Sequence, residues 1–270
     1  MKDFRDKVVI ITGSSMGIGK AVAWKLAKQG AKVVLNGRDL EKLNATTQEL
    51  TDGGYTVVSV QGDISNEQDC RRLISTTIER FGRIDILINN AGVSMRGEVQ
   101  DLSPALIHTI FQINTIGPFM LSQMALPHLK KTKGSIVFVS SLAGLRGLPG
   151  LSAYSASKMS LTALAESLRV EHKKDGIHIG LVYAGYTEIE NGKTTLNGEG
   201  KPVLLDERTG KLKHTIDEVA EKIVLHLAKR QKQTVIGVTG YFYAFLVKQF
   251  PALTERILNY QHKKITKIYK

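Results

Sequence analysis

The segment that decides the fold is Lys7–Gly30, KVVIITGSSMGIGKAVAWKLAKQG. Its apolar run Val8–Ile11 is typical of a buried parallel strand, and apolar residues recur at helical spacing after the glycines. Those glycines are Gly13, Gly17 and Gly19. Glycine permits a tight turn, close approach of a ligand to the backbone and close packing of helix on strand, while the positive end of a helix favours an anion. The segment therefore predicts a strand, a turn and a helix that bind the phosphates of a nucleotide.

Similar units follow along the chain. Strands are predicted at 8–11, 31–35, 55–60, 84–88, 135–139, 177–182 and 234–238. Helical periodicity lies between them, and Ser103 followed by Pro104 is a strong start for a long helix that runs towards Leu129. Strands that alternate with helices are typical of βαβ units. We expect an α/β fold with a single doubly wound parallel sheet of about seven strands and helices on both faces.

The composition fits one domain over residues 1–270 and limits the chemistry. Because Cys70 is the single cysteine, the chain has no internal disulfide and no cysteine-based metal site, and we expect no metal. No apolar run reaches the roughly 18 to 20 residues that a spanning helix needs. The charged start MKDFRDK is unlike a signal peptide, so we expect a cytoplasmic protein.

The net charge of +12 is concentrated near the C-terminus, where residues 211–270 hold 12 Lys and Arg against 4 Asp and Glu. Within this part, 241–270 is predicted to be a basic amphipathic helix rich in aromatic residues. Three interpretations stay open: a solvated face, packing on its own domain or on a second subunit, and peripheral contact with an anionic membrane at its inner face. Nucleic acid is not expected as a partner, because no base-reading motif accompanies the lysines.

A long stretch without periodicity lies between residues 186 and 214, where Gly, Asn, Lys and Glu dominate. A loop of this length in a compact domain usually has a function. It would lie over the carboxyl ends of the strands, where α/β sheets bind their ligands. We therefore predict that 186–214 forms a lid over a substrate.

The residues most suited to chemistry are Tyr154 and Lys158, which stand four apart at the start of a predicted helix and so share a face. A phenol is a poor acid at neutral pH, but a fixed ammonium nearby favours the phenolate and lowers the pKa of a phenol. Such a pair can act as a general acid or base. Ser141, at the end of the preceding strand, could donate a hydrogen bond to a substrate carbonyl.

The chain resembles the short-chain dehydrogenase/reductase family, and the similarity runs from about residue 7 to residue 238. Six features in register carry it: Thr12-Gly13-x3-Gly17-Ile18-Gly19, Asp63, Asn89-Asn90-Ala91-Gly92, Asn114, Ser141 and Tyr154-x3-Lys158. The resemblance implies a Rossmann-type fold and hydride transfer between a nicotinamide cofactor and a carbonyl or alcohol carbon.

The resemblance also implies a role for each of four catalytic residues. Tyr154 would donate the proton in reduction, and Ser141 would orient the substrate oxygen. Lys158 would bind the hydroxyls of the nicotinamide ribose and lower the pKa of the Tyr154 phenol. Asn114 would hold the water of a proton relay.

A larger set would bind the cofactor. Asp63 would contact the adenine, and Asn90–Gly92 would form the wall on the adenosine side. The full set is Gly13, Ser15, Gly17, Ile18, Gly19, Arg38, Asp63, Ile64, Asn90, Ala91, Gly92, Tyr154, Lys158, Gly185 and Thr187. Purely structural roles are the alternative, with Asn89 and Asn90 shaping a turn and Asp63 capping a helix.

Arg38 predicts which cofactor is used. A carboxylate near the end of the second strand would bind the adenosine ribose of NAD, but the chain reads Asn36-Gly37-Arg38 there. Because a guanidinium binds phosphate through two donors, NADP(H) is favoured. The alternative is a surface arginine paired with Asp39, and Met16 stands where many NADP-using relatives carry a basic residue.

One segment departs from the family pattern. After the sixth strand the family usually shows Pro-Gly and, several residues later, Thr, whereas this chain reads Tyr183-Ala184-Gly185-Tyr186-Thr187-Glu188-Ile189. Gly185 is kept, Ala184 replaces the proline, and Thr187 comes two positions early. How the nicotinamide carboxamide is held is left open.

We expect an NADP-dependent oxidoreductase that acts on a hydrophobic ketone or secondary alcohol, in a homo-oligomer, either dimer or tetramer. One alternative is a membrane-surface reductase of acyl-chain or steroid ketones. Another is a non-catalytic NADP-binding redox sensor or scaffold, which would not need a proton path.

Overall fold

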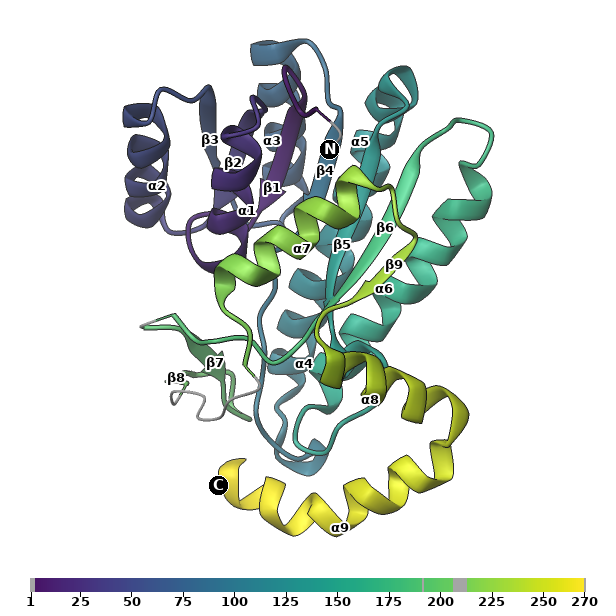
Figure 1. Ribbon diagram of the computed structural model, residues 1–270. Coiled ribbons are helices and arrows are strands. Elements are labelled where there is room, and N and C mark those ends of the chain that lie inside the picture. The colour runs from purple at the N-terminus through teal and green to yellow at the C-terminus, as the bar shows by residue number, and fades with distance from the viewer. Residues whose placement is uncertain (1–2, 191, 206–212, 270) are drawn as a thin grey trace.

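The computed structural model describes residues 3–190, 192–205 and 213–269, with side chains placed as far as Tyr260 and for His262. A seven-stranded sheet forms its centre (Figure 1). The strands are β1 (Val8–Thr12), β2 (Lys32–Gly37), β3 (Val57–Gln61), β4 (Ile86–Asn89), β5 (Ser135–Ser141), β6 (His178–Ala184) and β9 (Gln233–Val235). All pairs are parallel, in the order β3-β2-β1-β4-β5-β6-β9. The predicted sheet is confirmed.

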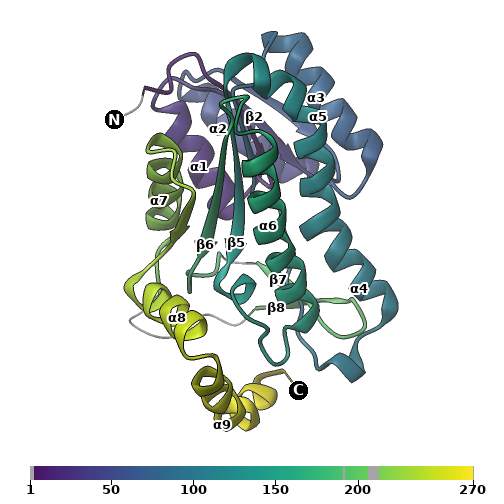
Figure 2. The same cartoon turned by 90° about the vertical axis from the view of Figure 1, so that its right-hand side faces the viewer.

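Helices cover both faces of the sheet, as Figure 2 shows. On one face lie α1 (Gly17–Ala27), α2 (Leu40–Asp52) and α7 (Ile216–Ala228). On the other lie α3 (Glu67–Phe81), α5 (Gly117–Thr132) and α6 (Ser152–Glu171). The strand β1 supplies Val8 and Ile10 to one core and Val9 and Ile11 to the other. Burial on both faces explains why this strand is continuously apolar.

The long helix expected from Ser103 to Leu129 is interrupted. The Ser103 hydroxyl accepts a hydrogen bond from the Leu106 amide at 3.2 Å and caps α4 (Pro104–Phe111). A π-helical segment, Gln112–Ile116, then joins α4 to α5. A π turn holds an extra residue, so the helix faces on either side of it are out of phase. This segment carries Asn114.

The predicted lid contains a short hairpin of β7 (Thr194–Leu196) and β8 (Pro202–Leu204). Residue 191 and residues 206–212 of the predicted lid lie outside the described residues. The hairpin joins the loop after β4, where Leu196 pairs with Met95. The Ser94 and Thr195 hydroxyls are also hydrogen-bonded, at 2.8 Å.

The C-terminal segment forms two helices where one was expected. They are α8 (Val238–Gln249) and α9 (Pro251–Tyr269). Phe250 separates them with φ −130° and ψ 60°, because a residue before proline avoids the helical region and proline lacks an N–H. Val238, expected to end the last strand, instead begins α8. No helix in the described part of the chain is long and apolar enough to cross a membrane.

Two buried histidines lie at the far side of the sheet from the glycine turn, on β6 and α7. The rings of His178 and His226 have centroids 5.8 Å apart. The Nδ1 atom of His226 lies 2.7 Å from the Thr234 hydroxyl oxygen. Burial lowers the pKa of His226 to about 3, and the charges of His178 and Arg169 add to the shift. The folded chain therefore holds this imidazole neutral.

This shift predicts acid lability. The pKa is lower in the folded than in the unfolded chain, where it is about 6.5, so the stabilisation is complete above pH 6.5. It is lost as the pH falls towards 3, by up to about 1.4 kcal/mol per pH unit. His226→Asn keeps a polar atom near Thr234 and removes the titration. Urea unfolding between pH 7 and pH 4 should show a smaller pH slope for this variant, with exposed His108→Asn as control. An unchanged slope would contradict the assignment.

Candidate active site

The carboxyl ends of the central strands bring the glycine turn against the loop after β4. Gly13 has φ +61°, and a Cβ atom there would lie 2.8 Å from the Cα of Ala91. A Cβ atom on Gly19 would lie 2.5 Å from Nδ2 of Asn90. No larger residue fits either position without moving backbone or a fixed side chain. The structure thus requires two of the three glycines for packing alone.

Asn90 and Thr12 tie these two turns together. The Asn90 side-chain amide donates to the carbonyl oxygens of Thr12 at 2.9 Å and Gly13 at 3.0 Å. The Thr12 hydroxyl oxygen accepts from the amides of Asn90 at 3.1 Å and Ala91 at 3.0 Å. The turn-shaping role considered for Asn90 is therefore present, and it fixes the wall of the crevice.

The N-terminus of α1 offers a place for phosphate. Its N-cap residue, Met16, makes no side-chain capping hydrogen bond. Gly17 has φ +58°, and a Cβ atom there would have a single near neighbour, Oε2 of Glu190 at 3.4 Å. Uncapped amides at a helix N-terminus bind anions. Gly17, Ile18 and Gly19 thus fit a diphosphate.

The ammonium group of Lys158 lies at the centre of the site. Its side chain is buried and donates to the carbonyl oxygen of Val139 at 3.1 Å. A Cβ atom on Gly92 would lie 3.0 Å from this nitrogen and 3.1 Å from Oδ1 of Asn114. Burial lowers the pKa of Lys158 to about 8, and the charge of Lys193 adds to the shift. The ammonium therefore holds its proton less tightly than an exposed lysine does, yet it stays mostly charged at pH 7.

Asn114 is completely buried in the π-helical segment. Its Oδ1 atom accepts from the Val93 amide at 2.9 Å. Its Nδ2 atom donates to the Val93 carbonyl at 2.9 Å and to the Ser157 hydroxyl at 3.0 Å. These bonds hold the loop after β4 against α6. Residue 118 is a proline without an N–H, so the Asn114 carbonyl lacks the donor that an α-helix supplies four residues later.

Tyr154 lies on α6, the helix that carries Lys158, and Ser141 lies on the strand β5. The Ser140 hydroxyl donates to the Lys158 carbonyl at 3.1 Å and so anchors α6 to β5. Ser141, the last residue of β5, accepts a hydrogen bond from the Ala143 amide at 3.2 Å. Tyr154 lies in the first turn of α6, half-buried, four residues before Lys158. Tyr154 packs against a buried apolar cluster of Met95, Leu106, Ile110 and Ala153, as Leu102 and Leu196 also do.

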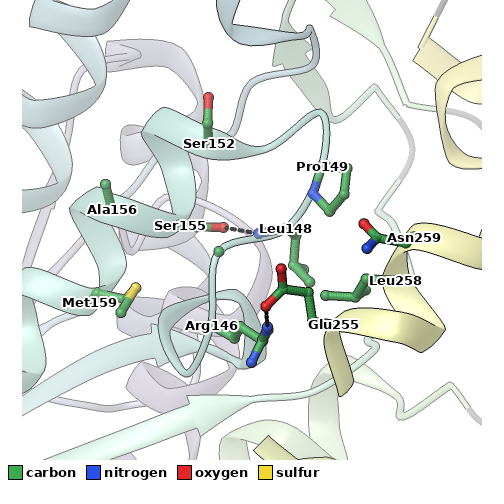
Figure 3. Close-up of a pocket in the computed structure, with 11 residues that line it drawn as sticks. Arg146, Leu148, Pro149, Ser152, Ser155, Ala156, Met159, Glu255, Leu258 and Asn259 are labelled. Carbon is green, nitrogen blue, oxygen red and sulfur yellow. Dashed lines mark hydrogen bonds and ion pairs between the residues drawn. The ribbon is translucent and has the colours of Figure 1, made fainter. Parts of the chain in front are cut away.

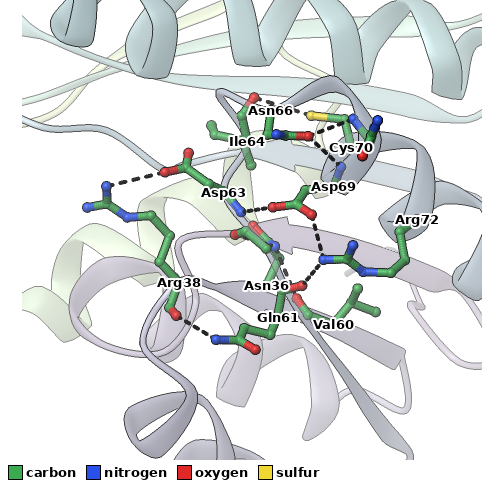
Figure 4. Close-up of polar contacts among 12 residues, drawn as sticks. Asn36, Arg38, Val60, Gln61, Asp63, Ile64, Asn66, Asp69, Cys70 and Arg72 are labelled. Atoms are coloured by element: carbon green, nitrogen blue, oxygen red, sulfur yellow. Dashed lines mark hydrogen bonds and ion pairs between the residues drawn. The ribbon is translucent and has the colours of Figure 1, made fainter.

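Arg38 lies at the end of β2 and points toward Asp63 (Figure 4). The guanidinium and the carboxylate are 3.5 Å apart, and the Arg38 side chain is 60% exposed. The alternative partner, Asp39, instead caps α2 by accepting from the Lys42 amide at 3.1 Å. A single long contact leaves Arg38 with further donors to offer a ligand.

Asp63 opens the loop after β3. Burial raises the pKa of its carboxyl group, but two hydrogen bonds from Ser65 and the charge of Arg38 outweigh burial and leave that pKa below its ordinary value. Its backbone amide donates to Asp69 at 2.8 Å. The adjacent Ile64 is buried, and its carbonyl accepts from Cys70 at 3.2 Å. Asp63 is therefore an ionised group at the rim of the crevice.

The segment 183–189, which departs from the family pattern, makes defined contacts beside the crevice. A Cβ atom on Gly185 would lie 2.8 Å from the carbonyl oxygen of Ile236, which explains why this glycine is kept. Thr187 is buried, and its hydroxyl donates to the Gly185 carbonyl at 3.1 Å. Thr187 and His214 also form a β-bridge, which holds the two ends of the predicted lid together.

The thiol of Cys70 and the side chains that can bind metals are the remaining candidates for chemistry. The Cys70 thiol is buried, and burial, with help from nearby acidic groups, raises its pKa to about 12. It is not a nucleophile at neutral pH. Among the described residues no group of His, Cys, Asp and Glu side chains could hold a metal ion.

A cavity of about 410 Å³ lies outside the catalytic cluster, between the start of α6 and α9. Figure 3 shows its lining, which includes Leu148, Met159 and Leu258. An ion pair of 3.2 Å between Arg146 and Glu255 joins its two sides. No local sequence pattern signals this cavity, because its two sides are far apart in the chain.

The comparisons with known proteins agree with this geometry. The profile for short chain dehydrogenase matches residues 7–200. The Danio rerio protein named dehydrogenase/reductase SDR family member 7B is 31% identical over 272 residues, covering 98% of this chain and 88% of its own length. An Arabidopsis thaliana protein named 11-beta-hydroxysteroid dehydrogenase-like 4A is 42% identical over 191 residues, 70% of this chain. The alignment spans only 62% of that relative.

Solved structures give the same result. A short chain dehydrogenase/reductase from Burkholderia phymatum, in complex with NAD, matches with a TM-score of 0.82 and 25% identity over 94% of this chain and 97% of its own. A metagenomic short-chain oxidoreductase in complex with NADP matches with a TM-score of 0.72 and 29% identity, over 87% of this chain and 98% of its own. The chain therefore belongs to the short-chain dehydrogenase/reductase family.

Proposed function

We propose that the chain is an NADP-dependent oxidoreductase that interconverts a hydrophobic ketone and its secondary alcohol. The observation that carries the proposal is the buried ammonium of Lys158, one helical turn from the half-buried phenol of Tyr154 at the edge of the crevice. A positive charge close to a phenol stabilises the phenolate. The pair can then donate and recover a proton at neutral pH.

Each catalytic side chain has a distinct task in this proposal. The bound nicotinamide supplies or accepts the hydride. Tyr154 donates the proton to the carbonyl oxygen, and Ser141 hydrogen-bonds the same oxygen and stabilises the charge that develops there. Lys158 orients the ribose hydroxyls and favours the Tyr154 phenolate.

The π-helical segment would supply the proton that Tyr154 gives up. The Asn114 side chain is committed to Val93 and Ser157. Its backbone carbonyl has no α-helical donor, because residue 118 is proline. We assign the water of the relay to this carbonyl and not to the side-chain amide.

The preference for NADP rests on Arg38. The guanidinium is largely exposed and meets Asp63 only at 3.5 Å. A 2′-phosphate carries more charge than one carboxylate and accepts two parallel N–H bonds, so it would compete well for Arg38. Similar structures carry NAD in one case and NADP in another, so the choice depends on this chain's own residues.

The apolar surroundings of Tyr154 support a hydrophobic substrate. Met95 and Leu196 meet there because the lid hairpin pairs with the loop after β4. Some relatives are named hydroxysteroid dehydrogenase-like. A ketone with an alicyclic or acyl body would replace water against these side chains.

A second candidate function, reduction of lipid-like ketones at a membrane surface, is favoured by α8 and α9. Along α8, Gly240 is the one buried residue. Phe245 and Phe250 meet at the junction of the helices with ring centroids 6.0 Å apart. Over residues 238–260, the large exposed apolar side chains are Val238, Tyr241, Phe242, Phe245, Phe250, Leu253, Ile257 and Tyr260.

The net charge of this segment favours an anionic membrane as its partner. Residues 238–270 hold six Lys and Arg and one acidic residue, Glu255. Aromatic side chains flanked by basic ones bind the interface of anionic bilayers. A second copy of this segment carries the same charge and would be repelled. A homo-oligomer formed through another surface stays a prediction.

Removing the phenol of Tyr154 should slow turnover strongly and leave NADPH binding nearly unchanged. Tyr154→Phe should lower the rate of NADPH oxidation with hydrophobic ketones by about 10² to 10⁴, while the Kd for NADPH, measured by fluorescence, changes less than about twofold, since the phenol is not a phosphate ligand. Tyr241→Phe, an exposed tyrosine on α8, is the control. Full activity of Tyr154→Phe would refute the mechanism. If the wild type bound NADPH but reduced no ketone, the result would favour the alternative of a non-catalytic redox sensor or scaffold.

Reversing the charge at residue 38 should change cofactor choice. Arg38→Asp should raise the KM for NADPH about ten- to a hundredfold, because a charged hydrogen-bonding partner of the 2′-phosphate is lost. The KM for NADH should change less than about threefold. Arg38→Gln removes the positive charge without adding a negative one, so it separates loss of the guanidinium from repulsion of the phosphate by the carboxylate that Arg38→Asp introduces. Arg71→Asp, on the exposed side of α3, is the control. Equal losses for both cofactors would contradict a phosphate contact.

Membrane contact should depend on the exposed aromatics of α8. The double variant Phe242→Ser, Phe245→Ser should sediment with anionic liposomes at least about tenfold more weakly than the wild type, because two apolar side chains no longer enter the interface. The control is Val170→Ser, which removes an exposed apolar side chain from α6. Wild-type protein that ignores anionic liposomes at low salt would refute this candidate.

A further inference from the structure

The carboxylate of Glu190 lies where the proposed function puts a phosphate. Glu190 belongs to the predicted lid, yet its Oε2 atom lies 3.4 Å from the position of a Cβ atom on Gly17, at the N-terminus of α1. This oxygen is buried and has no hydrogen-bond partner among the described residues. A buried carboxylate oxygen without a donor is costly. Its position therefore calls for an explanation beyond local packing.

Hydrogen bonds on both sides of Glu190 anchor its backbone. On one side, the amide of Glu188 donates to the His214 carbonyl at 2.8 Å, and Oε1 of Glu188 accepts from the Ile216 amide at 2.7 Å. On the other side, the Lys193 amide donates to the Glu190 carbonyl at 3.1 Å. The hairpin that follows is paired with the loop after β4. Glu190 can thus leave α1 by rotating its side chain while the lid stays anchored.

The electrostatics of α1 explain why a carboxylate rests there. No side chain caps the helix at Met16, so the positive end of the helix dipole attracts an anion. Among the described residues, the carboxylate of Glu190 lies closest to the position of a Cβ atom on Gly17. A dinucleotide brings a diphosphate to the same helix end, and two anions cannot share it without repulsion.

We propose that Glu190 is an internal competitor of the cofactor: its carboxylate occupies the diphosphate position at α1 and is displaced when a dinucleotide binds. Glu190 is thereby a residue that sets cofactor affinity and not a catalytic residue. This inference rests on the proposed nucleotide function, but not on the choice between NADP and NAD, since both carry the diphosphate.

The test compares Glu190→Gln with the wild type in direct binding. Glu190→Gln keeps the size of the side chain and removes its charge. The Kd for NADPH, measured by fluorescence titration in low salt, should fall about three- to tenfold, the range expected when one competing charge leaves a helix N-terminus. Glu199→Gln is the matched control, because Glu199 is an exposed lid carboxylate paired with Lys201 at 2.7 Å. It should bind NADPH like the wild type.

A second ligand tests whether the change in affinity arises at the diphosphate position. Adenosine 2′-monophosphate has no diphosphate, so its Kd, measured by competition with NADPH, should be the same for Glu190→Gln and the wild type. Unchanged NADPH affinity in Glu190→Gln would overturn the inference and leave the proposed function standing. Equal tightening of both ligands would also overturn it, since that pattern reports a general opening of the lid. Failure of every variant to bind NADPH or NADH would overturn both.

Discussion

The structure of the site depends on the burial of one ammonium group. Lys158 reaches the Val139 carbonyl, and in the described chain no carboxylate forms an ion pair with it. The surrounding residues make room for this charge. Gly92 lets the loop after β4 approach, and Ser140 holds the helix that carries Lys158. Because desolvation is only partly offset by one carbonyl, the ammonium keeps a strong influence on any phenol or hydroxyl nearby. The proposed chemistry of Tyr154 follows from that placement.

Much of this arrangement could be predicted from the sequence. Strands buried on both faces, such as β1, are continuous apolar runs, and the residues with chemistry follow strand ends or share one helix face, as Tyr154 and Lys158 do. These are local signals. The interruption of the helix at Asn114 was not predicted, because a π turn has no simple periodicity. The break before Pro251 was readable from the proline itself.

Contacts between distant segments lay beyond prediction. The pairing of Arg38 with Asp63 in place of Asp39 depends on how the loops after β2 and β3 turn toward each other. The approach of Glu190 to Gly17 depends on the lid, whose sequence has no period to read. The motif predicts which residues line the crevice, but only the tertiary structure brings Glu190 to the helix end where we propose that a diphosphate binds.

The crevice is assembled only from strand ends, and this has a consequence for the lifetime of the protein. Elements from Thr12 to Ala184 meet there through the parallel sheet, so a partly folded chain has no such site. A ligand that fills it binds the native state alone and adds to the free energy of unfolding, by about 2.7 kcal/mol at a hundredfold excess over Kd. The supply of dinucleotide in a cell would then help to decide how fast proteases remove the protein.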